Sequence, residues 1–196
     1  MISIAGRVLM TSRSQRSEIA LARLGCAKLR ERSHPRVLIG GLGLGFTLRA
    51  ALDTLPKRAR VVVAELNPVV VRWCRGPLAI LTDDCLSDPR VSVVEGDVTR
   101  VSRAVADQPA QPRFDAILWD LYRGPGHVPE GRTDALYGEH SIARTHRALS
   151  PGGVYAVWGE TRDAAFEARL ARCGFRVERA HTSESGPRHA VYLAVK

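Results

Sequence analysis

The sequence predicts an α/β fold with a mostly parallel, doubly wound sheet, and three observations support this prediction. From Arg36 onward, short apolar runs alternate with segments of helical periodicity, which is the pattern of βαβ units. The 196 residues suit one domain with an appended arm. Hydrophobic residues make up 45% of the chain and charged residues 25%, which is the composition of a globular protein.

The predicted elements follow in chain order. The first segment, Ile2–Met10, is expected to form a short β arm, and residues 17–32 a helix, because apolar residues recur there at helical spacing. Parallel strands are expected at Arg36–Ile39, Val61–Leu66, Val91–Glu95, Phe114–Trp119 and Val154–Trp158. Helices are expected at Phe46–Leu55, Pro68–Arg75, Tyr137–Leu149 and Thr161–Cys173, with a turn at Ser150–Gly153. The last two strands, Arg176–Thr182 and His189–Val195, are expected to form a C-terminal antiparallel hairpin.

The formal net charge of +9 arises in one part of the chain. Residues 1–60 hold 12 of the 29 lysine and arginine residues but only three acids, whereas the remainder is neutral. A basic segment of this kind can bind nucleic acid, so a non-catalytic RNA-binding module is one alternative. Because only three of the basic residues are lysines, the bias is typical of genome composition, and nucleic acid is not the expected partner.

Several function classes are not expected. Apolar runs such as Val61–Ala64 are far shorter than the ~18 residues of a membrane helix, and no signal peptide is recognisable. The four cysteines are scattered without a Cys-x-x-Cys pair, so we expect reduced cysteines and a cytoplasmic location. The six histidines lack metal-ligand spacing, so no metal is expected.

A glycine-rich segment follows the first parallel strand directly. Its sequence is Gly40-Gly41-Leu42-Gly43-Leu44-Gly45, and a predicted helix begins immediately after it. Glycines at this place let the backbone approach a ligand, and the helix N-terminus offers free N–H donors. Alternatively, the glycines only shape a tight turn. A nicotinamide-binding oxidoreductase is disfavoured, because Phe46 stands where the third glycine of the dinucleotide pattern belongs.

Acidic residues stand at the ends of the next three strands. Glu65 follows Gly45 by 20 residues, Asp97 follows Gly96, and Asp120 follows the fourth strand. The carboxyl ends of parallel strands face one crevice, where Glu65 can accept hydrogen bonds from both ribose hydroxyls and Asp97 from an adenine amino group. Three acids repel a pyrophosphate but suit a ligand with a cationic centre and an ammonium group.

These motifs resemble those of the class I S-adenosylmethionine-dependent transferases, and within that class the spermidine synthases and their relatives. The resemblance covers about residues 36–158 and is carried by Gly40–Gly45, Val62–Leu66, Asp88–Val91, Glu95–Asp97, Phe114–Asp120 and Leu149–Gly153. It implies a Rossmann-like domain at residues 34–196 preceded by an arm and helix at 1–33. It also implies S-adenosylmethionine, or its decarboxylated form, bound by Gly40, Gly41, Gly43, Gly45, Glu65, Leu66, Gly96, Asp97, Val98 and Asp120.

The departures from the polyamine synthase pattern concern the acceptor. The second aspartate of that pattern is replaced by Arg123, and the glutamine on the N-terminal arm by Leu9. Arginine at this place repels a cationic amine, so methylation of a small molecule is the predicted reaction. Aminopropyl transfer, as in polyamine biosynthesis, and another reaction that releases methylthioadenosine remain alternatives.

Asp120 is the predicted catalytic residue, because a carboxylate beside a sulfonium can hold an amine and accept its proton. The alternative is that Asp120 only caps the following loop. In that loop Tyr122, Arg123 and His127 are candidate contacts to the small-molecule acceptor, and the resemblance places Glu18 there too. A homodimer is a further expectation, because the short arm leaves a sheet edge open.

Overall fold

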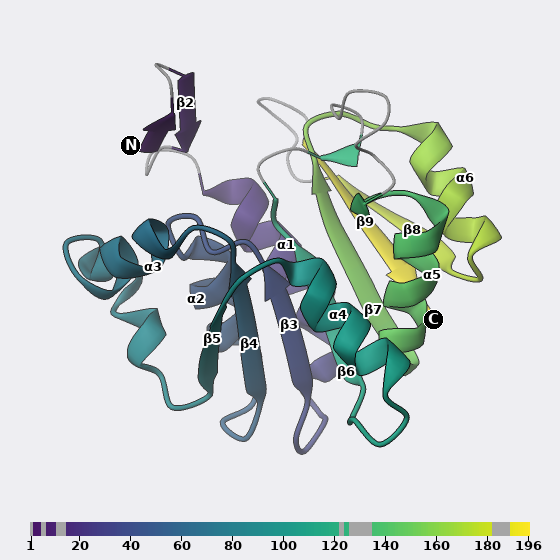
Figure 1. Ribbon diagram of the computed structural model, residues 1–196, viewed down its shortest axis with the longest axis horizontal. Coiled ribbons are helices and arrows are strands. Elements are labelled where there is room, and N and C mark those ends of the chain that lie inside the picture. The colour runs from purple at the N-terminus through teal and green to yellow at the C-terminus, as the bar shows by residue number, and fades with distance from the viewer. Residues whose placement is uncertain (1, 5–6, 11–14, 122–123, 126–134, 182–188) are drawn as a thin grey trace.

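Seven strands form one sheet through the middle of the protein, and helices cover both of its faces (Figure 1). This computed structural model describes residues 2–4, 7–10, 15–121, 124–125, 135–181 and 189–196. The strands are β1 (Ile2–Ile4), β2 (Arg7–Met10), β3 (Arg36–Gly40), β4 (Arg60–Glu65), β5 (Val91–Glu95), β6 (Phe114–Trp119), β7 (Leu149–Gly159), β8 (Arg176–His181) and β9 (Ala190–Val195). The α-helices are α1 (Arg16–Cys26), α2 (Phe46–Thr54), α3 (Pro68–Arg75), α4 (Val98–Asp107), α5 (Glu139–Ala148) and α6 (Ala164–Arg172). Short 3₁₀ helices are η1 (Ala27–Leu29), η2 (Ala79–Thr82) and η3 (Cys85–Ser87).

The strand order of the large sheet is β5-β4-β3-β6-β7-β9-β8. The five strands from β5 to β7 are parallel, while β9 pairs antiparallel with both β7 and β8. β1 and β2 pair with each other in a separate two-stranded sheet. The predicted fold class is therefore confirmed: the sheet is Rossmann-like, with a C-terminal antiparallel pair. The strand order reverses beside β3, which is where ligands bind in doubly wound sheets.

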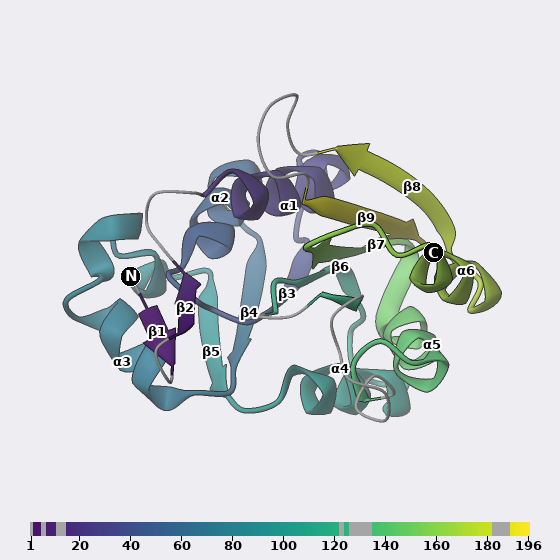
Figure 2. The ribbon, with the colours of Figure 1, turned by 90° about the horizontal axis from the view of Figure 1, so that it is seen from above.

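Alternating side chains of the strands divide the core into two layers. Val37 and Ile39 of β3 pack with α1, α2 and α3, whereas Leu38 packs with α4, α5 and α6 on the other face. Figure 2 shows α1 and α2 on one side of the sheet and α4 and α5 on the other. None of the helices in the described ranges is long and apolar enough to cross a membrane.

Three details differ from the sequence predictions. Helix α4 was not predicted, although Asp97 caps it and Val98, Val101 and Val105 follow at helical spacing. The segment Ser150–Gly153, predicted as a turn, lies within β7, where the register against β6 shifts between Phe114 and Ala116. A β-bulge accommodates the extra residues of β7, so the strand continues past Pro151, Gly152 and Gly153. Helix α5 begins at Glu139, two residues later than predicted, so Tyr137 precedes it.

Basic side chains close the helices at the amino ends of the strands. The Arg113 guanidinium donates to the carbonyl of Val105 near the end of α4, and Lys196 Nζ donates to the carbonyls of His146 and Leu149 at the end of α5, both at 2.8 Å. Carbonyls at a helix C-terminus lack partners within the helix and carry partial negative charge. These two cations therefore neutralise helix ends.

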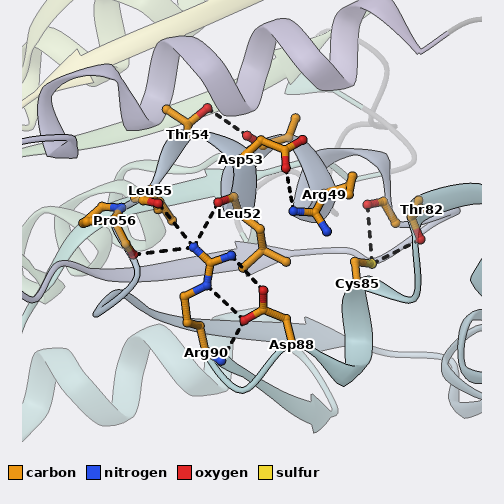
Figure 3. A network of polar contacts seen from close by, with 12 residues as sticks. Arg49, Leu52, Asp53, Thr54, Leu55, Pro56, Thr82, Cys85, Asp88 and Arg90 are labelled. Carbon is orange, nitrogen blue, oxygen red and sulfur yellow. Dashed lines mark hydrogen bonds and ion pairs between the residues drawn. The ribbon is translucent and has the colours of Figure 1, made fainter.

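Arg90 donates hydrogen bonds to carbonyls at the end of α2 in a similar way (Figure 3). Its Nη1 donates to the carbonyls of Leu52 at 2.9 Å and Leu55 at 3.2 Å, while Nε and Nη2 hold the Asp88 carboxylate at 2.9 and 2.7 Å. These hydrogen bonds lower the pKa of the Asp88 carboxyl below its usual range. The network joins the start of β5 to the end of the helix that follows the glycine segment.

We expect Arg90→Met to lower the free energy of unfolding by about 2–4 kcal/mol, because two carbonyls and a carboxylate then lose their charged donor. Urea unfolding followed by circular dichroism measures this loss.

The matched control is Arg49→Met. Arg49 lies on α2 and is also labelled in Figure 3. Its partner Asp53, at 2.5 Å, is 63% exposed, so removing this ion pair should cost less than about 1 kcal/mol. If both variants lose the same free energy of unfolding, the hydrogen bonds of Arg90 to the end of α2 contribute no more than an exposed ion pair.

Candidate active site

The glycine segment connects β3 to α2 and lies against the end of β6. Gly41 has φ +87°, and a Cβ there would stand 2.4 Å from the carbonyl oxygen of Asp120. Gly45 has φ +86° and is the N-cap of α2, so its left-handed conformation starts the helix. The predicted residues Gly40, Gly41, Gly43 and Gly45 thus all lie where the chain passes from strand to helix at the reversal of strand order. Glycines at this place leave the backbone without side chains where a ligand is expected to bind.

Glu65, the last residue of β4, binds the glycine segment. Its Oε2 accepts a hydrogen bond from the Leu42 backbone N–H and its Oε1 from that of Asn67, both at 2.8 Å. Each carboxylate oxygen has a second lone pair, so both can still accept from a ligand hydroxyl. The next residue, Leu66, is 75% exposed. An acceptor next to an exposed apolar side chain fits a ribose with its attached base.

Asp97 lies beside Glu65 because β4 and β5 pair in register at their ends. The backbone N–H of Gly96 donates to the carbonyl of Glu65 at 2.8 Å. Asp97 is the N-cap of α4, and its Oδ1 accepts from the Thr99 N–H at 2.8 Å. The buried Val98 lies close to Gly40, since a Cβ on that glycine would stand 2.8 Å from its Cγ2. The predicted cofactor residues of β4, β5 and the glycine segment are therefore neighbours.

Asp120 follows β6 and is attached to the glycine segment on two sides. Its backbone N–H donates to the carbonyl of Gly40 at 2.9 Å, and its Oδ2 accepts from the Thr47 hydroxyl at 2.5 Å. Burial raises the pKa of the Asp120 carboxyl to about 7, the Thr47 bond opposes this rise, and the charge of Glu18 adds to it. A carboxyl that titrates near neutral pH can accept and return a proton.

Two further elements contribute groups to the surroundings of Asp120. Glu18 on α1 accepts a hydrogen bond from the Ser17 hydroxyl at 2.6 Å and influences Asp120 through its charge. The buried Tyr137 packs edge-on against Trp119, with ring centroids 5.8 Å apart. Burial and the charge of Asp120 raise the pKa of the Tyr137 phenol above its ordinary value. Glu18 is thus linked to Asp120 through its charge.

The sequence prediction missed Thr47 and Tyr137, and the remaining predicted residues cannot be located. Thr47 is the second residue of α2. Its position in the sequence indicates no chemical role until its hydrogen-bond partner Asp120, which follows β6, is known. Tyr122, Arg123 and His127 lie outside the described residues. Within the described ranges, no group of three or more His, Cys, Asp and Glu residues can hold a metal ion.

A cavity of about 690 Å³ opens beside Tyr137, between the start of α5 and α6. Glu139, Arg169 and Arg172 line it together with Tyr137, whereas none of the predicted cofactor residues does. Arg172 is paired with Glu139 at 2.6 Å.

By sequence, the chain is similar to polyamine aminopropyltransferases of several bacteria. The chain is 32% identical over 123 residues to polyamine aminopropyltransferase 2 of Pseudomonas aeruginosa and 26% identical over 132 residues to the polyamine aminopropyltransferase of Clostridium tetani. These matches cover 63% and 66% of this chain but only 33% and 43% of the relatives, so the chain matches less than half of their length. No profile of a known protein family matches the chain.

Solved structures support the fold. The spermidine synthase of Thermotoga maritima superposes with a TM-score of 0.69 at 21% identity, covering 93% of this chain and 60% of that one. Human methyltransferase-like protein 13, in complex with SAH, gives a TM-score of 0.64 at 20% identity, covering 92% and 80%. The chain thus has the Rossmann-like fold of the S-adenosylmethionine-dependent transferases, and in sequence it is similar to the polyamine aminopropyltransferases.

Proposed function

We propose that this protein uses an adenosyl sulfonium cofactor to alkylate the amine of a small molecule. Aminopropyl transfer is the first candidate, because the sequence relatives are polyamine aminopropyltransferases. The observation that carries the proposal is Asp120, a carboxyl that burial brings to a pKa of about 7 at the end of β6. It lies on the same rim as Glu65, the last residue of β4, and Asp97, which follows β5.

The residues present fit the cofactor. Glu65 keeps free lone pairs for the two ribose hydroxyls, and the exposed Leu66 offers an apolar surface to the adenine ring. Asp97 uses one oxygen for the helix cap, which leaves the other for the adenine amino group. When bound, the cofactor supplies an electrophilic carbon attached to a positively charged sulfur. The glycine segment and the N-terminus of α2 would hold the rest of its chain.

Asp120 would bind and orient the acceptor amine. In amine alkylation the nitrogen lone pair forms the new C–N bond, the C–S bond breaks to leave a neutral thioether, and the nitrogen loses a proton. Ionised Asp120 can hold the amine in line with the carbon and accept that proton. A positive sulfonium close by favours the ionised form, so the cofactor would lower the pKa of Asp120.

Methyl transfer is the second candidate, and Arg123 favours it. Where the polyamine synthase pattern has a second aspartate, this chain carries a cation that opposes a diamine acceptor. The two reactions differ in the donor, because aminopropyl transfer requires the decarboxylated form of S-adenosylmethionine.

Calorimetric titration of the protein with S-adenosylmethionine, its decarboxylated form and methylthioadenosine distinguishes the candidates. We expect the decarboxylated form to bind at least about tenfold more tightly than S-adenosylmethionine if the aminopropyl chain is transferred, which corresponds to about 1.4 kcal/mol. The opposite preference would favour methylation. Binding of none of the three would contradict the proposed function.

Asp97→Asn should weaken the binding of all three adenosyl compounds by about tenfold. The asparagine Oδ1 still caps α4, but its amide NH₂ now faces the adenine amino group, and two donors cannot pair. Because asparagine caps helices as well as aspartate, the free energy of unfolding should change by less than about 1 kcal/mol. Unchanged affinity in a stable variant would exclude Asp97 as the adenine contact.

Asp120→Asn should reduce kcat/KM by about 10²-fold or more, because asparagine cannot accept the proton. In the unmodified protein, kcat/KM should fall on the acid side of about pH 7, where Asp120 becomes protonated. Initial rates measured from about pH 5 to about pH 9 test both points, because this range extends roughly two units on either side of the pKa of Asp120.

The control for Asp120→Asn is the affinity for methylthioadenosine. This thioether has neither the sulfonium charge nor an aliphatic amine, so its dissociation constant should change by less than about threefold. A loss of methylthioadenosine binding as large as the loss of activity would indicate a damaged fold instead.

A further inference from the structure

The contact between Thr47 and Asp120 links the glycine segment to the predicted catalytic group. Thr47 is 2% exposed and lies in the first turn of α2, and its hydroxyl donates to Asp120 Oδ2 at 2.5 Å. Asp120 is also fixed through its main chain, because its N–H donates to the carbonyl of Gly40 at 2.9 Å. Its own carbonyl oxygen lies against Gly41, leaving no room for a Cβ there. Both the backbone and one carboxylate oxygen of Asp120 are therefore held.

The Thr47 hydroxyl donates a hydrogen bond to one oxygen of this carboxylate, Oδ2. In our interpretation the second oxygen, Oδ1, faces the ligand. A carboxylate held at one oxygen by a buried donor cannot rotate freely, so the direction of the other oxygen is fixed as well. Such preorientation is what an amine-binding carboxylate needs.

The other groups around Asp120 do not help it to ionise. Glu18, from α1, is a like charge and disfavours the carboxylate, and Tyr137, from the turn before α5, is a neutral phenol whose own pKa is raised. Glu65 and Asp97 at the ends of β4 and β5 are acids of the same sign. A hydrogen bond to the charged form favours ionisation, so the Thr47 hydroxyl acts against burial and against the charge of Glu18.

We propose that Thr47 is a positioning residue for Asp120: its hydroxyl fixes Oδ2, directs Oδ1 to the acceptor amine and stabilises the charged carboxylate through this hydrogen bond. This inference rests on the proposed function, because it assigns Asp120 to an amine. The contact itself, however, is a property of the protein without any ligand. The two can therefore fail separately.

The test is Thr47→Val, which replaces the hydroxyl with a methyl group of similar size. The pKa of Asp120 is read from its ¹³C carboxyl shift in ligand-free protein, and kcat/KM is measured across the same pH range. We expect the pKa to rise by about one unit and kcat/KM below pH 7 to fall about tenfold, with a smaller difference at high pH.

Thr54→Val is the matched control. Thr54 is also buried in α2, but its hydroxyl donates to the Ala50 carbonyl within the helix at 2.8 Å (Figure 3). It should leave the pKa of Asp120 and the pH profile unchanged. Thr47→Ser keeps the hydroxyl and should restore both values, whereas a general packing defect would not be corrected in this way.

An unchanged pKa of Asp120 in Thr47→Val would overturn the inference, and so would an equal shift in Thr47→Ser. If Thr47→Val does not fold, Thr47→Ala removes the same hydroxyl with less steric demand. A raised pKa in a protein that binds none of the adenosyl compounds would support the Thr47 contact and contradict the proposed function alone.

Discussion

The direction of the strands in the parallel sheet is the constraint on which the other features depend. Because each helix returns antiparallel to its strand, helix N-termini gather at the carboxyl ends of the strands and helix C-termini at the amino ends. Negative side chains are therefore favoured at the carboxyl rim and positive side chains at the amino rim. Acidic side chains follow β4, β5 and β6 on one rim, while Arg90, Arg113 and Lys196 close helices on the other.

The carboxyl rim is held together mainly by backbone groups. Glu65 accepts from the N–H of Leu42, and Asp120 donates its own N–H to Gly40. The acids that are expected to meet a ligand thus also fasten the glycine segment between their strands. These contacts fix the conformation that glycine alone leaves free.

The sequence predicted the parallel strands well, because each is a short apolar run with a clear end. It failed where local signals conflict with the tertiary structure. Ser150–Gly153 contains a Pro-Gly-Gly run that favours a turn. It stays within β7 because Leu149 and Val154 on either side pair with β6, and because Gly152 and Gly153 exchange backbone hydrogen bonds with Lys196. Helix α4 was overlooked although its cap and valine spacing were present. The acceptor loop residues Tyr122, Arg123 and His127 stay predictions.

Composition, periodicity and the acids at strand ends determined the fold class and the rim on which the candidate site lies, because these depend on local sequence and on the rule that parallel strands end together. Only the tertiary structure decided which groups touch. Thr47 and Asp120 are far apart in the chain, and their hydrogen bond exists because β3 and β6 are neighbours. The pKa of about 7 at Asp120 was equally invisible in the sequence, since burial and the charge of Glu18 are set by packing.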